Sequence, residues 1–218
     1  SLTSTAVSVF AHVEQVPGDP ILGLTDAYNA DSRATKVNLG VGIYYDEDGR
    51  IPLLAAVRKI EEQLAAAGRP RGYLPIDGLA TYTSATRELV FGKESELVAA
   101  GRVATTQTVG GSGALRVGAE LLAQTLPHAT LALSNPSWEN HRAVFGAAGF
   151  TVQDYTYFDP ATHGVDFAGM LADLGKLEPG TVVLLHACCH NPTGADLSPD
   201  QWRQVAALLK ERGLFPFI

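Results

Sequence analysis

The sequence has few cysteines, no long apolar run and no excess of basic side chains. Its only two cysteines, Cys188 and Cys189, are neighbours, which argues against a disulfide framework and favours a reducing, cytoplasmic setting. No apolar run reaches the length of a membrane-spanning helix, and the first residues carry no secretory signal pattern. The 16 basic side chains are outnumbered by 23 acidic ones and form no cluster, which argues against nucleic acid or an anionic membrane as a partner.

What the sequence does have is enough apolar material for a folded core. The 218 residues are 46% hydrophobic and 18% charged, which fits one large domain or one domain with a small appendage. Residues 1–18 mix small polar and isolated apolar side chains, so we interpret them as an N-terminal arm that lies on another surface.

Short apolar segments alternate with helical segments along the second half of the chain. Strands are predicted at residues 130–133, 150–155 and 181–186, with another beginning at 214. Helices are predicted up to about 148, over 166–174, and from a capping box at Ser198, with Trp202, Val205, Ala206 and Leu209 facing the core. This alternation predicts an α/β fold, with a mostly parallel sheet covered by helices on both faces.

The first half is predicted to hold helices and one interrupted strand. One helix is predicted to begin near Pro20, a second to begin near Pro52 and end before Gly68, and a third to span about 79–91. The strand is predicted over 36–44.

A glycine-rich turn lies between a β-prone run at 105–109 and an apolar helix. Gly110, Gly111 and Gly113 let the backbone turn tightly, and the first N–H groups of the helix have no carbonyl partner, so the turn can receive a phosphate. Ser112 would either cap the helix or add a hydroxyl donor. A tight connection without any ligand is the alternative.

Two further loops at the same predicted sheet edge carry chemistry. Trp138 could stack on a flat ring, Asn191 could hydrogen-bond a ring oxygen, and His141 or His186 could orient a neighbouring group. Ligands of open parallel sheets bind beyond the carboxyl ends of the strands, so these side chains and the glycine turn are expected to lie around one site. Their combined chemistry favours a phosphorylated heteroaromatic ligand. Singly, these residues also fit a core tryptophan, a turn asparagine and a core histidine. Zinc is the weaker alternative, since the cluster from His186 to His190 lacks a second ligand pair.

These motifs resemble one family, the class I pyridoxal-phosphate aminotransferases of the aspartate and aromatic amino acid type. The resemblance begins at Asp19 and is carried by five segments: residues 37–44 (VNLGVGIY), 73–78 (YLPIDG), 107–115 (QTVGGSGAL), 134–141 (SNPSWENH) and 186–194 (HACCHNPTG). It implies fold type I, a three-layer α/β/α large domain with part of a small domain, and transamination between an aromatic or acidic L-amino acid and a 2-oxo acid such as 2-oxoglutarate.

The resemblance also implies roles for the cofactor-binding residues. Gly111 and Ser112 would bind the phosphate of pyridoxal 5'-phosphate, joined by Tyr73 from the second subunit of a homodimer. Trp138 would stack on the pyridine ring and Asn191 would hydrogen-bond its hydroxyl group.

Three further roles concern the substrate and the groups behind the ring. Gly42 would contact the substrate carboxylate, with Trp138 and Asn191 also at the substrate. His141 would orient the aspartate that pairs with the pyridine nitrogen, and His186 would support it from behind.

The sequence departs from the family pattern in one respect. The Schiff-base lysine, the pyridine-pairing aspartate and the carboxylate-binding arginines would all lie beyond Ile218, so no catalytic residue is expected in this chain and we expect the chain to be cut short. A catalytically incomplete fragment, or another pyridoxal-phosphate reaction on the same fold, is the alternative. The expected domains are an arm (1–18), a small-domain segment (19–48) and an incomplete large domain (49–218).

Overall fold

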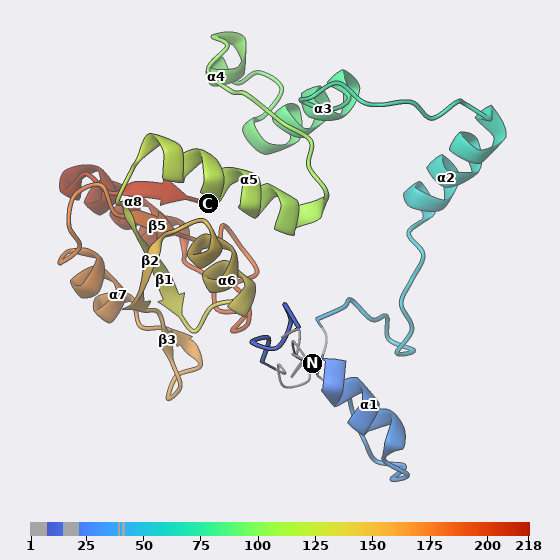
Figure 1. Ribbon diagram of the computed structural model, residues 1–218, viewed down its shortest axis with the longest axis horizontal. Coiled ribbons are helices and arrows are strands. Elements are labelled where there is room, and N and C mark those ends of the chain that lie inside the picture. The colour runs from blue at the N-terminus through green and yellow to red at the C-terminus, as the bar shows by residue number, and fades with distance from the viewer. Residues whose placement is uncertain (1–7, 15–21, 39, 41) are drawn as a thin grey trace, which may run out of the picture. The chain divides into compact units, whose positions relative to one another are not determined.

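A computed structural model describes residues 8–14, 22–38, 40 and 42–218 (Figure 1). The chain forms two compact units, residues 1–72 and 73–218, and each is described by itself. The predicted start of a helix at Pro20 lies outside the described residues, as does most of the predicted arm.

The N-terminal unit contains two helices, α1 (Leu22–Ala30) and α2 (Ala55–Ala67). Gly68 ends α2 in the left-handed conformation (φ 54°), where glycine carries no steric penalty. The helix is amphipathic, yet none of its residues is buried within the unit. Its sequence thus specifies a helix without specifying a partner for its apolar face.

A strand predicted at 36–44 is absent from the described residues of that segment, so this prediction was wrong. The side chain of Asn38 accepts the backbone amide of Gly40 (2.9 Å), a local hydrogen bond that competes with a strand ladder. The Lys36 ammonium group donates to the carbonyls of Tyr28 and Asp31, which ties the segment back to the end of α1.

The C-terminal unit consists of a parallel sheet with helices around it (Figure 1). Its helices are α3 (Ala80–Phe91), α4 (Glu96–Ala99), α5 (Gly110–Thr125), α6 (Glu139–Ala147), α7 (Phe167–Leu174) and α8 (Pro199–Arg212). Its strands are β1 (Thr130–Asn135), β2 (Thr151–Thr156), β3 (Phe158–Asp159), β4 (Gly164–Val165), β5 (Val182–Leu184) and β6 (Phe215–Phe217). The sheet order is β2-β1-β5-β6, with every pair parallel, and β3 and β4 form a separate antiparallel pair.

The two faces of this sheet bury separate cores. Leu131, Leu133, Val182 and Leu184 face one core with residues of α5 and α6, whereas Ala132 and Val183 face the other with residues of α7 and α8. Alternate strand residues point to opposite faces, so this division follows directly from the strand geometry. The predicted three-layer α/β/α arrangement with a parallel sheet is confirmed.

Helix α8 begins as its sequence indicates. The Ser198 hydroxyl accepts the amide of Gln201 (3.2 Å), and the Gln201 side chain accepts the amide of Ser198 (2.8 Å), which completes the capping box. Val205 and Leu209 are buried. Ala206 is exposed, so its predicted place in the core was wrong.

A predicted strand before the glycine turn does not form either. The backbone amide of Gln107 donates to the carbonyl of Asp77 (3.0 Å), and its side chain accepts the amide of Leu79 (3.0 Å). Gly78 lies so close that a Cβ atom there would fall 2.3 Å from that of Gln107. Residues 105–109 are therefore held by a loop and not by a strand ladder.

Within the residues that the structure describes, no helix is both long enough and apolar enough to cross a membrane.

Candidate functional site

The order of the strands creates a switch point between β1 and β5. From β1 the chain moves outward to β2 and then returns to the other side of β1 for β5 and β6. Ligands of open parallel sheets bind outside the carboxyl ends of the strands at such a point. The loops that follow β1 and β5 carry Trp138, His186 and Asn191, so the sequence motifs and the topology indicate the same place.

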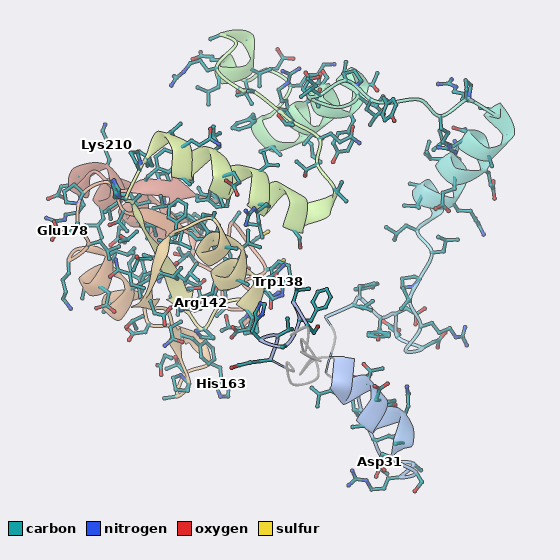
Figure 2. The ribbon with its side chains drawn as sticks, viewed as in Figure 1. Asp31, Trp138, Arg142, His163, Glu178 and Lys210 are labelled. Carbon is teal, nitrogen blue, oxygen red and sulfur yellow. The ribbon has the colours of Figure 1, made fainter. Side chains whose placement is uncertain are left out.

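A pocket of about 290 Å³ lies at this edge. Its lining includes Trp138, His141, His186 and Asn191, together with Leu115 of α5. Four of the sequence-predicted site residues thus share one cavity. The side chain of Trp138 stands at the beginning of α6 (Figure 2).

The glycine turn opens directly into α5, beside this pocket. Gly110 has a φ of 63° and is the first residue of the helix, so Gly111 and Ser112 lie in the first turn, where N–H groups lack an i−4 acceptor. The residue that caps the helix is Val109, so the alternative in which Ser112 caps it was wrong. The Ser112 hydroxyl instead accepts a hydrogen bond from the side-chain Nδ2 of Asn140 on α6 (3.1 Å).

Close packing fixes α5 over the sheet. A Cβ atom on Gly118 would lie 2.7 Å from the ring of Phe217, so only glycine lets the helix approach β6 this closely. Leu115, which lines the pocket, and the first-turn residues Gly111 and Ser112 belong to the same helix, so this contact helps to fix their place relative to the sheet.

Three imidazole rings form a row that begins with His141 and His186 in the pocket lining and ends behind it at His190. His141 meets His186 edge to face, with ring centroids 5.0 Å apart, and His186 stacks on His190 at 4.3 Å. The indole of Trp138 meets His141 edge to face at 5.4 Å. The row connects α6, on which His141 lies, to the loop after β5.

Hydrogen bonds hold these rings in defined orientations. The amide of Asn191 donates to His186 Nδ1 (3.0 Å), which places the ring proton of the neutral imidazole on Nε2. His141 Nδ1 lies 2.9 Å from the hydroxyl of Ser137. Among the described residues, buried His186 Nε2 has no hydrogen-bond partner. Buried polar atoms without a hydrogen-bond partner are uncommon in native proteins.

Burial keeps the row uncharged. It lowers the pKa of His141 to about 4, with a further contribution from the neighbouring His186. Burial likewise lowers the pKa of His190 to about 4, and it lowers the pKa of His186, where the carboxylate of Asp196 acts in the opposite direction. The three rings are therefore neutral at pH 7.

The loop after β5 is held by one carboxylate. Asp196 accepts the amides of Cys189 (2.8 Å) and His190 (2.9 Å), and these two hydrogen bonds lower the pKa of its carboxyl group. The backbone next to Asn191 is thus fixed from outside the pocket.

Two predicted site residues are not brought into this pocket by the C-terminal unit. The side chain of Tyr73 is fully exposed at the beginning of that unit. Gly42 belongs to the N-terminal unit, where a Cβ atom added to it would meet nothing within 4 Å.

His190 was considered from the sequence only as a metal ligand. The pattern that could have revealed its place is its position directly before Asn191, on a loop that follows a buried strand. Among the described residues, no group of three or more His, Cys, Asp or Glu side chains is arranged to hold a metal ion.

Comparison with known proteins identifies the same family for most of the chain. The model of the family described as aminotransferase class I and II matches residues 34–218. An aspartate aminotransferase of Pseudomonas aeruginosa is 58% identical over 212 residues, which are 97% of this chain and 53% of that protein. A cytoplasmic aspartate aminotransferase of rice (Oryza sativa subsp. japonica) is 49% identical over 96% of this chain and 52% of its own length.

Solved structures agree with this result. An aromatic-amino-acid aminotransferase from Burkholderia pseudomallei, covalently bound to pyridoxal phosphate, is 58% identical and superposes with a TM-score of 0.93. The superposition covers 97% of this chain and 53% of that one. The chain thus spans about half the length of the relatives it matches.

Proposed function

Because the chain belongs to the class I and II aminotransferases, we propose that it supplies the cofactor pocket of a pyridoxal-phosphate-dependent aminotransferase. In the proposed reaction, an aspartate or aromatic L-amino acid gives its amino group to a 2-oxo acid such as 2-oxoglutarate. The observation that carries the proposal is the single cavity shared by Trp138, His141, His186 and Asn191 at the switch point of the sheet.

The residues of the pocket fit pyridoxal phosphate in their chemistry. An indole offers a flat apolar face for a heteroaromatic ring, and a carboxamide offers a donor for a ring oxygen. The amides of Gly111 and Ser112 in the first turn of α5 suit a phosphate dianion, which the helix dipole also favours. Beside Gly111 the space is open, since an added Cβ atom would meet nothing within 4 Å.

The proposed roles follow from these positions. Gly111 and Ser112 bind the phosphate, Trp138 stacks on the ring, and Asn191 donates to the ring oxygen. His186 lines the pocket, and its buried Nε2–H group has no acceptor among the described residues, which leaves it free to donate to a group near the cofactor. His141 supports the same region from α6.

The cofactor, when bound, supplies the electron sink for chemistry at the α-carbon of the amino acid. The chain's own residues bind the cofactor, orient its ring and shield one side of it from water. Among the residues that the structure describes, no lysine lines the pocket, so an amine that binds the cofactor covalently has to come from outside these lining residues.

The same proposal includes the assembly and the domains. We propose a homodimer in which the exposed Tyr73 reaches the phosphate of the partner's pocket, and we keep Gly42 at the substrate carboxylate. The arm (1–18), the small-domain segment (19–48) and the large domain (49–218) remain the proposed division. A cytoplasmic location is supported by the name of the rice relative.

Cofactor titration combined with intact mass tests this function. The protein should bind pyridoxal phosphate, and borohydride reduction should add a pyridoxyl group to the denatured mass if a reactive lysine is present. Turnover of aspartate or tyrosine with 2-oxoglutarate should accompany that adduct. Binding without an adduct or turnover would support the incomplete-fragment alternative, and turnover of an amino acid without a 2-oxo acid would favour another reaction of the fold.

The variant Asn191→Ala tests the pocket itself. It should weaken pyridoxal phosphate binding by about tenfold, since one hydrogen bond to a charged or strongly polar group contributes about 1.5 kcal/mol. Gln204→Ala removes an exposed carboxamide from α8 and serves as the matched control. Equal binding by both variants would contradict the site.

A further inference from the structure

A buried imidazole lies behind the pocket without lining it. The ring of His190 is stacked between Tyr157, at a centroid distance of 4.0 Å, and His186, at 4.3 Å. His190 is 2% exposed. It reaches the pocket lining through its contact with His186 and through the loop that the two residues share.

The hydrogen bonds of His190 fix its own tautomer. The Ser134 hydroxyl donates its one proton to the carbonyl of Pro136 (3.0 Å), so its oxygen accepts from His190 Nε2–H (2.8 Å). On the other side, Thr193 Oγ1 accepts the amide of Ala195 (3.1 Å) and donates to His190 Nδ1 (2.7 Å). Both ring nitrogens are thus engaged, with the proton on Nε2.

The same residue connects three segments that meet at the sheet edge. Ser134 belongs to β1, Tyr157 follows β2, and Thr193 lies in the loop after β5. The Tyr157 hydroxyl also donates to the carbonyl of Ala195 (2.6 Å) in that loop. The His190 ring therefore holds this loop together with the Asp196 carboxylate and the Tyr157 hydroxyl.

The position of the loop in turn determines the state of His186. The amide of His190 is fixed by Asp196, and the next amide in the chain, that of Asn191, donates to His186 Nδ1. The flat face of His190 lies 26° from parallel to the ring of His186 and limits its rotation. His190 thus stacks on the ring of His186 and directly precedes the amide that sets the tautomer of that ring.

We propose that His190 is a positioning residue that holds the His186 ring toward the pocket with its proton on Nε2. The inference rests on the proposed function only where it makes His186 a neighbour of bound pyridoxal phosphate. The state of the His186 ring is a property of the chain and is measured separately.

Nitrogen-15 NMR of the imidazole rings tests the proposal, because the two ring nitrogens of each neutral tautomer have distinct chemical shifts. In the unaltered protein, His186 and His190 should each show a single Nε2–H tautomer at pH 7. The variant His190→Phe retains a stacked ring but removes both hydrogen bonds. It should shift the His186 nitrogens toward a mixture of tautomers and weaken pyridoxal phosphate binding by about tenfold, as is common when a residue behind a ligand-binding group is lost.

Two further variants separate positioning from general stability. His190→Gln returns one donor and one acceptor and should recover part of the His186 shift and of the affinity. Val205→Ala removes buried methyl groups in the core on the α8 side and should lower the unfolding midpoint without moving the His186 signals.

Several outcomes would overturn the proposal. Unchanged His186 signals in His190→Phe would do so, as would a tautomeric mixture at His190 in the unaltered protein. If His190→Phe does not fold, Thr193→Val and Ser134→Ala each remove one of its hydrogen bonds and must move the same signals. If the unaltered protein does not bind pyridoxal phosphate but the His186 signals move, the proposed function fails while the positioning role stands.

Discussion

The sheet has one cavity at the amino ends of its strands and another at their carboxyl ends, called here the amino edge and the carboxyl edge. At the amino ends of the strands lies a cavity of about 570 Å³, lined by residues 125–130, Gln153 and residues 178–181. At the carboxyl ends lies the pocket of about 290 Å³ that contains Trp138 and Asn191. Figure 2 shows Glu178, of the first cavity, on the opposite side of the C-terminal unit from Trp138.

The two cavities differ in how their polar groups are engaged. At the amino edge, the Thr181 hydroxyl donates to the carbonyl of Glu178 (2.7 Å), and Thr130 and Thr181 lie within hydrogen-bond distance of each other (3.2 Å). These groups satisfy one another. At the carboxyl edge, buried His186 Nε2 has no partner among the described residues. Two hydroxyl groups of the larger cavity are therefore paired with protein atoms, whereas an imidazole nitrogen of a residue that lines the smaller pocket has no such partner.

The two edges also differ in their electrostatics. Helix α5 begins at the carboxyl edge with Gly110 and Gly111, so its free N–H groups and positive dipole end face that side. At the amino edge the same helix ends near Thr125, which lines the cavity there. An anionic ligand is thus favoured at one edge and disfavoured at the other, whatever the two volumes are.

The largest expected effect that separates the edges comes from Trp138→Ala. Removing the indole should weaken pyridoxal phosphate binding by about 100-fold, because burying roughly 100 Å² of ring surface contributes about 2.5 kcal/mol. Trp138→Phe should recover most of this loss. The measurement is a titration followed by cofactor absorbance.

The chain offers its second tryptophan as the control. Trp202 packs against the core on the α8 side, away from the pocket lining. Trp202→Ala should lower stability and leave cofactor affinity within about twofold of normal. Equal losses of affinity in Trp138→Ala and Trp202→Ala would contradict the assignment of the cofactor to the pocket that contains Trp138.

The second prediction concerns pH and uses the neutral imidazoles of the carboxyl edge. His141 and His190 have a pKa of about 4 in the folded chain against about 6.5 when unfolded. Between these values the unfolded state binds more protons, so stability rises with pH and is lost as the pH falls below about 6.5. The slope should reach up to about 1.4 kcal/mol per pH unit for each ring.

Urea unfolding at pH 7, 6 and 5 measures this slope. His141→Phe should reduce this slope by up to the contribution of one proton, which is about 1.4 kcal/mol per pH unit. The carboxyl groups of Asp173 and Asp196, whose pKa values are lowered by hydrogen bonds, contribute at lower pH. A free energy of unfolding that stays constant from pH 7 to pH 5 would contradict the conclusion that the buried imidazole rings are neutral in the folded protein.

Local patterns in the sequence predicted much of the carboxyl edge. The capping box at Ser198 and the alternating apolar segments specify elements through near neighbours, so α8 and the strands of the sheet occur close to their predicted positions. Trp138, His141 and Asn191 were grouped from the sequence because each follows a predicted strand, and His186 because it ends one. The parallel arrangement then placed their loops at one edge.

Other features depend on distant contacts and were missed. The run at 105–109 is β-prone, yet the contact of Gln107 with Asp77 and Leu79 keeps it a loop. The apolar residues of α2 are spaced along one helix face as those of α8 are, but of these two helices only α8 buries residues within its unit. The stacking of His190 against Tyr157 involves residues 33 positions apart (190 − 157), and no local pattern reports such a contact.

A third, smaller effect separates cofactor binding from the stability of the scaffold. Ser198→Ala removes the side-chain cap of α8 and should lower the free energy of unfolding by about 1 kcal/mol. Ser198→Asp should restore it. Cofactor affinity should stay unchanged in both variants, because Ser198 does not line the pocket. A matching loss of affinity would mean that α8 and the pocket are coupled.

The smallest expected effect is at the amino edge and decides whether its larger cavity binds a ligand. Gln153→Ala removes an exposed amide that lies 3.4 Å from the Thr130 hydroxyl and lines the cavity. Stability should change by less than about 0.5 kcal/mol, as for most surface positions, and cofactor affinity should be unaltered. The same titration used for Trp138→Ala provides the test. A tenfold loss of affinity in Gln153→Ala would place the ligand at the amino ends of the strands, where the carboxyl-edge residues could not reach it.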